Sequence, residues 1–243
     1  MMPMPRIAHS RETMDAMRQR LVQIALDLYR REGIEAISFR RVAEAAAISH
    51  TLPYRYFDSK EALLAALRTE VTNAFDRHVH ALERSDLPPL AHIRSVAHAY
   101  IDYVRRWPTD YLLIFAAQAT PITDYPDLMA ARAAVIEHGV HCVQRAIDAG
   151  LIDGDASQVA HLFWMALHGL MSLHVADQLR HGQTIDDLLE PMLVRMLGTP
   201  APAPAEGAAA MRAGAASTPV RRSRAAAPSE LIEPRRRRGG PRG

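Results

Sequence analysis

The sequence contains one cysteine, Cys142, in 243 residues. A single thiol excludes an internal disulfide and is typical of a reducing compartment, so we expect a cytoplasmic protein. The first residues, "MMPMPRIAHS", have no apolar run of the kind that a secretory signal needs. The most apolar stretch, residues 159–176, is interrupted by His161, His168 and His174 and has no basic flank. We therefore expect a buried helix there, and no membrane partner.

Strand signals are also missing. The sequence has no sustained β-branched alternation and no Asn-Gly hairpin turn, whereas apolar residues recur about every 3.6 positions throughout. This pattern predicts an all-α fold. The expected helices span residues 14–32, 39–46, 50–57, 59–82, 90–106, 108–118, 126–149, 155–181 and 184–197.

Charge is distributed unevenly along the chain. Residues 1–60 carry ten basic and seven acidic side chains, residues 61–198 carry ten and 17, and residues 199–243 carry nine and three. The basic ends suggest contact with a polyanion. Residues 199–243 are rich in Ala, Pro and Arg with scarcely any large apolar side chain, so we expect a disordered tail. Its "PRRRRGGPRG" could hold nucleic acid nonspecifically, although a solvated end explains it equally well.

Two short helices, 39–46 and 50–57, are joined by about three residues and flanked by longer helices, which is the pattern of a helix-turn-helix. In that motif the second helix enters the major groove of DNA with groups that reach phosphates and base edges. The second helix here offers His50, Thr51, Tyr54, Arg55 and Tyr56. Ser38 and Ser49 precede the two helices as N-caps, a position that also suits a phosphate, and Lys60 follows them.

The aromatic residues around Arg55 have two interpretations. A tyrosine hydroxyl can bond to phosphate, and Arg55 can neutralise a phosphate or read guanine through two hydrogen bonds. Taken alone, however, an aromatic cluster at helical spacing is more often part of a core. Phe57 should turn inward and pack, and Pro53 fits a first helical turn, where its missing N–H costs little.

The segment "RLVQIALDLYRREGIEAISFRRVAEAAAISHTLPYRYFDSKEALLAAL" (20–67) resembles the DNA-binding domain of the TetR (tetracycline-repressor-like) family of bacterial transcriptional regulators. The likeness covers the whole three-helix module and includes Tyr54-x-Tyr56-Phe57 and Ser59-Lys60-Glu61. It implies a helix-turn-helix domain over residues 10–58. It also implies that double-stranded DNA is contacted by Ser38, Arg40, Ser49, His50, Thr51, Tyr54, Arg55, Tyr56 and Lys60.

Two positions depart from the family pattern. The usual glycine of the turn is Ala47, which requires either strain or a right-handed turn. Leu52-Pro53 replaces the usual Thr-Leu and leaves the start of the recognition helix open. Both departures give some support to a protein that keeps the fold without reading DNA selectively.

The same resemblance implies that residues 59–198 form a helical ligand-binding and dimerisation domain, with an unknown small molecule as effector. "WMALHGLMSLHVADQ" (164–178) resembles a subgroup named after a Trp-His-Gly signature. A helix over 155–181 that is apolar on nearly all faces needs cover on nearly all faces. We therefore expect it to pair with 184–197 across a homodimer, where Gly169 would permit close approach.

Five side chains are candidates for the effector pocket: Trp107, Tyr111, Phe115, Trp164 and His168. The first three share one helical face at i, i+4 and i+8. An apolar pocket with a few polar groups is the usual form of a small-molecule site. An ordinary core explains the same stripe, and that alternative stays open.

Histidines are concentrated in the second half, where ten of the twelve lie between positions 78 and 181. His138, His141 and Cys142 share a helical face at i, i+3 and i+4, a geometry that could bind zinc or copper. No second cysteine or carboxylate stands at an evident spacing. We therefore predict no metal and no cofactor, and a metal sensor stays an alternative.

These features together predict a ligand-responsive DNA-binding transcriptional regulator, of the repressor type that is usual in the family. A dimer would bind a pseudo-palindromic operator and be released by a small molecule. The chain has no G-x-S-x-G, G-x-G-x-x-G, P-loop or H-E-x-x-H motif, so we predict no enzymatic activity. The alternative is a helical interaction protein or metal sensor of the same fold.

Overall fold

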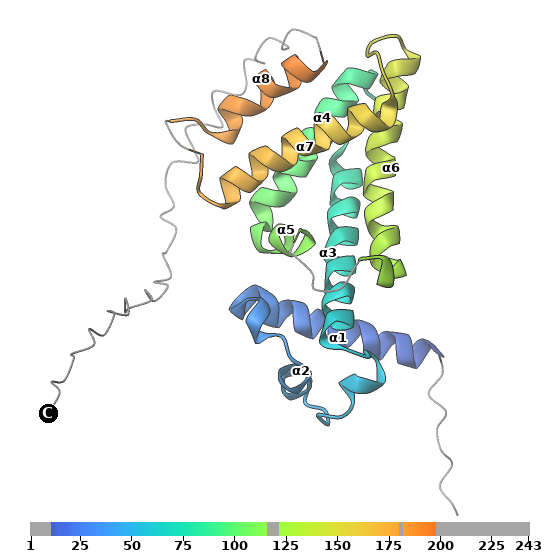
Figure 1. Cartoon of the computed structure of the whole chain (residues 1–243), viewed down its shortest axis with the longest axis vertical. Coiled ribbons are helices and arrows are strands. Elements are labelled where there is room, and N and C mark those ends of the chain that lie inside the picture. Colours follow the sequence, from blue (N-terminus) through green and yellow to red (C-terminus); the bar gives the residue numbers. More distant parts are fainter. Residues whose placement is uncertain (1–10, 116–121, 180–181, 198–243) are drawn as a thin grey trace, which may run out of the picture. The chain divides into compact units, whose positions relative to one another are not determined.

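Every regular element in the described part of the chain is helical (Figure 1). The computed structural model describes residues 11–115, 122–179 and 182–197. The α-helices in these ranges are α1 (Arg11–Glu32), α2 (Phe39–Ala46), α3 (Lys60–Leu82), α4 (Pro89–Arg106), α5 (Pro108–Ile114), α6 (Pro126–Asp148), α7 (Ala156–Val175) and α8 (Ile185–Leu197). Short 3-10 helices accompany them at η1 (Ile34–Ala36), η2 (Pro53–Arg55) and η3 (Ile122–Asp124). The all-α prediction is confirmed.

Serine side chains cap two helices, α2 at the predicted Ser38 and α3 at Ser59, whereas the expected cap Ser49 begins no α-helix. The Ser38 hydroxyl accepts a hydrogen bond from the N–H of Arg41 at 3.3 Å, and the Ser59 hydroxyl accepts one from the N–H of Ala62 at 3.0 Å. Each bond satisfies one of the N–H groups that a helix N-terminus leaves unpaired. The helices α4, α5 and α6 instead begin with proline, whose missing N–H costs little in a first turn.

The helix α3 is common to both halves of the fold (Figure 1). It packs on α1 and also contacts α4, α5 and α6. Leu63 and Leu67 are fully buried near its start, and Val71 and Phe75 are buried further along. Burial of side chains of this size stabilises a fold by about 1.5–3 kcal/mol each. A displacement of α3 would therefore disturb both halves together.

A second connection joins α1 to α5. Arg30 donates two hydrogen bonds to the Asp110 carboxylate, at 2.9 and 2.7 Å. The Tyr29 hydroxyl donates to the carbonyl oxygen of Thr109 at 2.9 Å. Asp110 is only 3 % exposed, so Arg30 supplies the charge that its buried carboxylate needs.

The helix α7 ends earlier than the sequence predicts, at Val175 instead of residue 181. Asp177 adopts a φ of 54°, and the N–H of Gln178 donates back to the carbonyl of Leu173 at 2.7 Å. A left-handed residue of this kind closes a helix. No glycine or proline stands at this point of the sequence to mark the end.

Some expectations fall on residues outside the described ranges. These are residues 116–118 of the predicted 108–118 helix, which as α5 already ends at Ile114, together with positions 180–181 and the tail at 199–243. All described residues lie in one compact unit, so the expected boundary at residue 58 stays a prediction. None of the helices described here is long and apolar enough to cross a membrane.

Candidate nucleic-acid interface and effector cavity

The turn after α2 is left-handed. Ala47 has φ 55° and ψ 45°, a region that residues other than glycine rarely adopt. Its N–H donates to the carbonyl of Glu44 at 3.1 Å, and the N–H of Ile48 donates to the carbonyl of Ala43 at 3.0 Å. Of the two conformations that the sequence left open at Ala47, the strained one is observed. The strain costs about 1–2 kcal/mol.

Glycine at position 47 is expected to stabilise the protein. Ala47→Gly relieves the Cβ strain but gives the unfolded chain more entropy, so the expected net gain in the free energy of unfolding is about 0.5–1 kcal/mol. Urea denaturation measures this gain. Ala45→Gly, at an exposed position inside α2, is the matched control and should lose about 1 kcal/mol. An equal loss from Ala47→Gly would contradict the left-handed turn.

The predicted recognition helix over residues 50–57 is not an α-helix, so that prediction was wrong. Only Pro53–Arg55 is helical, as the 3-10 helix η2. The N–H of Leu52 donates to the carbonyl of Ser49 at 2.9 Å, and the N–H of Arg55 donates to the carbonyl of Leu52 at 3.0 Å. An α-helix would pair the carbonyl of Ser49 with an N–H at position 53, which proline lacks. Tighter i to i+3 bonds take its place.

Buried side chains fix this segment to the rest of the domain. Phe57 is 3 % exposed, as the sequence predicts, and the guanidinium carbon of Arg18 lies 5.2 Å from the centre of its ring. Pro53 is buried, and Ile48 and Tyr56 are partly buried against the core. The segment from Ile48 to Phe57 is therefore held by these four buried or partly buried side chains as well as by its backbone hydrogen bonds.

Most of the predicted DNA-contacting side chains face outward. The exposed ones are Arg40, Ser49, His50, Thr51, Tyr54 and Arg55, and the half-buried ones are Ser38, Tyr56 and Lys60. Tyr54 is 63 % exposed and rests edge-on against Phe39, with 4.6 Å between the ring centres. The hydroxyls of Ser49 and Thr51 share a hydrogen bond of 3.0 Å. Polar, positively charged and aromatic groups thus lie together on one accessible surface, which we call the recognition surface (residues 49–56).

Comparison with known families agrees with this geometry. Residues 21–67 match the family described as bacterial regulatory proteins, tetR family, and residues 93–196 match a tetracyclin repressor-like C-terminal domain. The chain belongs to the TetR family. TetR-family proteins are DNA-binding transcriptional regulators and not enzymes, so DNA is the partner that the family assigns to the helix-turn-helix. The prediction of a non-enzymatic chain is confirmed, whereas the Trp-His-Gly subgroup is not confirmed.

Individual relatives are distant. The nucleoid occlusion factor SlmA of Actinobacillus pleuropneumoniae is 21% identical over 105 residues, which are 43% of this chain and 52% of the relative. The chain thus spans about half the length of the curated relatives it matches. A protein of unknown function from Rhodococcus sp. RHA1 has a TM-score of 0.66 at 22% identity, over 79% of this chain and 98% of the other. The TetR-family regulator PfmR from Thermus thermophilus has a TM-score of 0.54 at 18% identity, over 74% and 98%. These structures share the TetR fold.

The five predicted pocket residues do not all meet. Tyr111, Phe115, Trp164 and His168 form one aromatic group, in which the Tyr111 hydroxyl lies 2.7 Å from Nδ1 of His168. Trp107 lies apart from them, between α4 and α5, against His78 and Tyr103. The backbone of Trp107 breaks the helix at φ −132° and ψ 60°. The expected single face through positions 107, 111 and 115 is therefore wrong.

Two adjoining cavities lie between α3, α4, α6 and α7, with volumes of about 100 and 260 Å³. They share the walls Phe75, Tyr100, Val135, Ile136 and Trp164. Of the predicted pocket residues, Trp164 lines both cavities and Phe115 lines the larger one. Tyr111 and His168 lie behind Phe115 as a second layer.

Arg68, which no sequence pattern singles out, is a buried cation one turn before Thr72 on α3. Arg68 is 4 % exposed, and its Nη2 donates to the carbonyl of Ile114 at 3.0 Å. Its Nε and Nη1 have no hydrogen-bond partner among the described residues, and neither has the hydroxyl of Thr72. Thr72 and Arg132 line the cavity. Burial, together with the charge of Arg132, lowers the pKa of Arg68 to about 10, so Arg68 stays charged at neutral pH.

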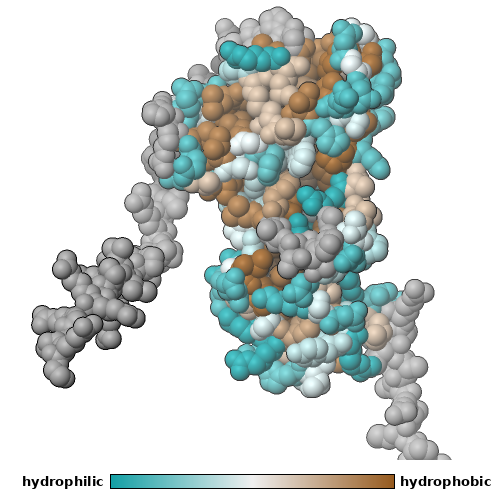
Figure 2. Space-filling view, in the orientation of Figure 1, coloured by the Kyte–Doolittle hydropathy of each residue, from teal (hydrophilic) through white to brown (hydrophobic). Residues whose placement is uncertain are grey.

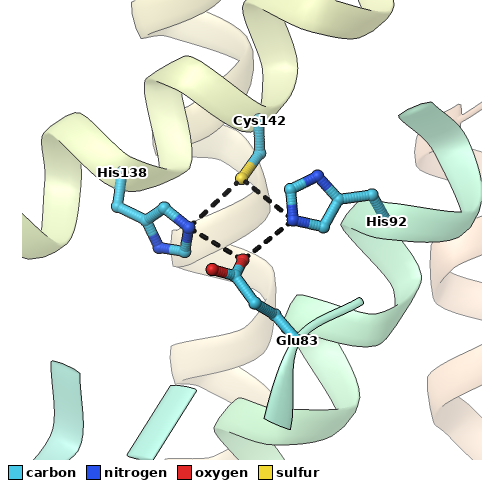
Figure 3. A group of neighbouring side chains, drawn as sticks. All are labelled: Glu83, His92, His138 and Cys142. Atoms are coloured by element: carbon cyan, nitrogen blue, oxygen red, sulfur yellow. Dashed lines mark hydrogen bonds and ion pairs between the residues drawn. The ribbon is translucent and has the colours of Figure 1, made fainter. Parts of the chain in front are cut away.

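A second polar group gathers at the other end of α3 (Figure 3). Glu83 follows α3, His92 lies on α4, and His138 and Cys142 lie one turn apart on α6. One ligand atom from each of the four lies within 4.8 Å of the others. His141, which shares the predicted metal-binding face, is exposed and is not part of this group. The sequence could not reveal Glu83 and His92, because both are distant from His138 along the chain.

Proposed function

We propose that this TetR-family protein is a ligand-responsive repressor that binds a pseudo-palindromic operator as a homodimer and is released by a small molecule. The observation that carries the proposal is the recognition surface, where Tyr54 and Arg55 point to solvent above a buried Phe57. Arg55 is the side chain best suited to a guanine edge, and Tyr54 and the hydroxyls of Ser49 and Thr51 suit phosphates.

An exposed apolar stripe on α7 supports a dimer. Leu162 is 55 % exposed, Met165 is 61 % exposed and Leu173 is 48 % exposed, and Gly169 lies between them. Figure 2 shows apolar surface in the part of the view where Figure 1 draws α7. Among the described residues, no neighbouring atom lies within 4 Å of the position that a Gly169 Cβ would occupy. A second copy packed on this stripe would cover it, and the dimer would present two recognition surfaces about 34 Å apart, one turn of duplex.

The cavities between α3 and α7 are the proposed effector site. Their walls are largely apolar. The smaller cavity has polar groups at Asp76, His138 and Cys142, and the larger one has Thr72 and Arg132. The buried Arg68 lies one turn before Thr72 on α3. A buried cation with two unused donors calls for an anion. The effector that fits is a small amphiphile with a carboxylate or similar anionic group at Arg68 and an apolar body along Phe75 and Trp164.

The route from effector to DNA runs through α3. Thr72 lies on α3 beside the cavity, and the same helix begins directly after the recognition surface. The effector binds better to the conformer whose recognition surfaces are badly spaced for DNA. Bound effector therefore lowers the affinity for DNA, and bound DNA lowers the affinity for the effector by the same factor.

A gel shift against the DNA upstream of the chain's own coding region tests the proposal. We expect selective binding with a steep salt dependence. Arg55→Ala should weaken selective binding by about 1–3 kcal/mol, because the lost guanidinium contacts a base edge. Arg84→Ala removes the same charge from a surface ion pair with Asp86 and is the control, expected to bind as the parent does.

Two results would contradict the proposal. Equal weak affinity for every duplex would favour an interaction protein that keeps the fold without reading DNA. Equal affinity in Arg55→Ala and the parent would remove Arg55 from base recognition.

A further inference from the structure

The group formed by Glu83, His92, His138 and Cys142 is compact and sheltered. Oε2 of Glu83 lies 2.8 Å from Nε2 of His92 and 2.9 Å from Nε2 of His138. The Cys142 sulfur lies 3.5 Å from Nε2 of His138 and 3.9 Å from Nε2 of His92. His92 and Cys142 are buried, and Glu83 and His138 are half-buried. Figure 3 shows the four side chains pointing toward one another from α4, from α6 and from the residue that follows α3.

We propose that these four side chains bind a single zinc ion or a similar divalent transition metal. Thiolate, imidazole and carboxylate are the ligands that zinc takes, and four protein ligands are typical of a structural zinc site. The site would join the end of α3 to α4 and α6. This proposal does not depend on DNA binding.

The distances agree with a tetrahedral arrangement. Zinc lies about 2.0–2.3 Å from nitrogen, oxygen and sulfur ligands, which places the ligand atoms of a tetrahedron about 3.3–3.8 Å apart. The two sulfur–nitrogen distances, 3.5 and 3.9 Å, are close to that range. The two contacts of Glu83 are shorter because they are hydrogen bonds. They need to open by about half an ångström, which a glutamate side chain allows by rotation.

Charge also favours the ion. A divalent cation with one carboxylate and one thiolate is neutral, as a sheltered site requires. When zinc binds, the proton of Cys142 passes to solvent. Each imidazole then carries its proton on Nδ1, which leaves the Nε2 lone pair free for the metal.

One neighbour must move. Nη1 of Arg145 lies 2.9 Å from Nδ1 of His92. When His92 binds a metal through Nε2, its Nδ1 carries a proton and can no longer accept a hydrogen bond from Arg145. The same Nη1 lies 3.3 Å from the carbonyl of Ser85, and Arg145 is half-exposed. Arg145 can therefore keep the Ser85 contact and turn away from His92. Removing the charge of Arg145 should therefore not weaken metal binding.

Metal analysis of the purified full chain tests the proposal. The protein is incubated with Zn²⁺, excess metal is removed by gel filtration, and bound zinc is measured by elemental analysis. We expect about one zinc per chain. Cys142→Ser and His138→Gln should each weaken zinc binding by about 100-fold or more, since changes to residues that only support the ligands already cost about 10–100-fold. His141→Gln, on the same helix but outside the group, is the matched control and should keep the zinc.

Cobalt supplies a second readout, and circular dichroism confirms that each variant is folded. Co²⁺ in the parent and in His141→Gln should show a thiolate charge-transfer band in the near ultraviolet, which Cys142→Ser should lose. Arg145→Gln should bind zinc at least as tightly as the parent. Substoichiometric zinc in the parent, loss of zinc from His141→Gln or Arg145→Gln, or a cobalt spectrum without the thiolate band would each overturn the proposal. The group would then be a hydrogen-bonded network around Glu83.

Discussion

Arg68→Met is expected to abolish binding of an anionic amphiphile while making the ligand-free protein more stable. Arg68 is a buried cation with two unused donors, so its replacement by an apolar side chain of similar length removes a desolvation cost. The expected gain in the free energy of unfolding is about 1–3 kcal/mol, after allowing for the hydrogen bond to Ile114 that is lost. A residue kept at such a cost is a candidate for binding.

Octanoate and 1-octanol are a matched pair of probes for this prediction, since they differ only in the head group. Octanoate should raise the melting temperature of the parent protein, and it should have no effect on Arg68→Met. Octanol should act equally on both proteins. A parent that responds to octanol and not to octanoate would show that Arg68 does not receive an anion.

Arg30→Ala is expected to destabilise the protein by about 3 kcal/mol, because it leaves the carboxylate of Asp110 buried without a partner. Asp110→Asn should cost only about 1 kcal/mol, since the Arg30 side chain is 40% exposed and can turn to water. The larger loss thus follows from removing the more exposed partner. Denaturant unfolding of both variants measures the difference.

The double variant separates the pair interaction from the two single losses. Arg30→Ala with Asp110→Asn should be more stable than Arg30→Ala alone, because no buried charge is left unpaired. Additive losses would show that the bond between α1 and α5 contributes little. Tyr29 offers an independent check, since its hydrogen bond to Thr109 joins the same helices.

Much of the fold could be predicted from the sequence, because helix caps and apolar periodicity agree with where the helices end and which side chains are buried. Ser59 marks the start of α3 both as a cap and as the end of the helix-turn-helix. The apolar periodicity of α3 agrees with its burial at Leu67, Val71 and Phe75. The predicted end of α7 was wrong because a left-handed Asp177 closes the helix, and aspartate at that position is no clear stop signal.

The recognition surface was predicted in composition but not in backbone. The sequence assigned Pro53 to the first turn of an α-helix. In the structure Pro53 has no N–H to donate to the carbonyl of Ser49, and the segment forms a 3-10 helix instead. Side-chain groups that depend on long-range contact could not be predicted. In the sequence, Arg68 looks like a solvent-exposed residue of a helix. Glu83 lies 55 positions before His138, so no local spacing connects the two.

Hydroxyl-radical footprinting on the DNA upstream of the chain's own coding region tests the central claim most directly. The claim is that two recognition surfaces of a dimer occupy successive major grooves. The account predicts two protected patches on one face of the duplex, about one helical turn (10–10.5 base pairs) apart, both lost together in Arg55→Ala. A single protected patch, or protection unchanged by Arg55→Ala, would contradict it.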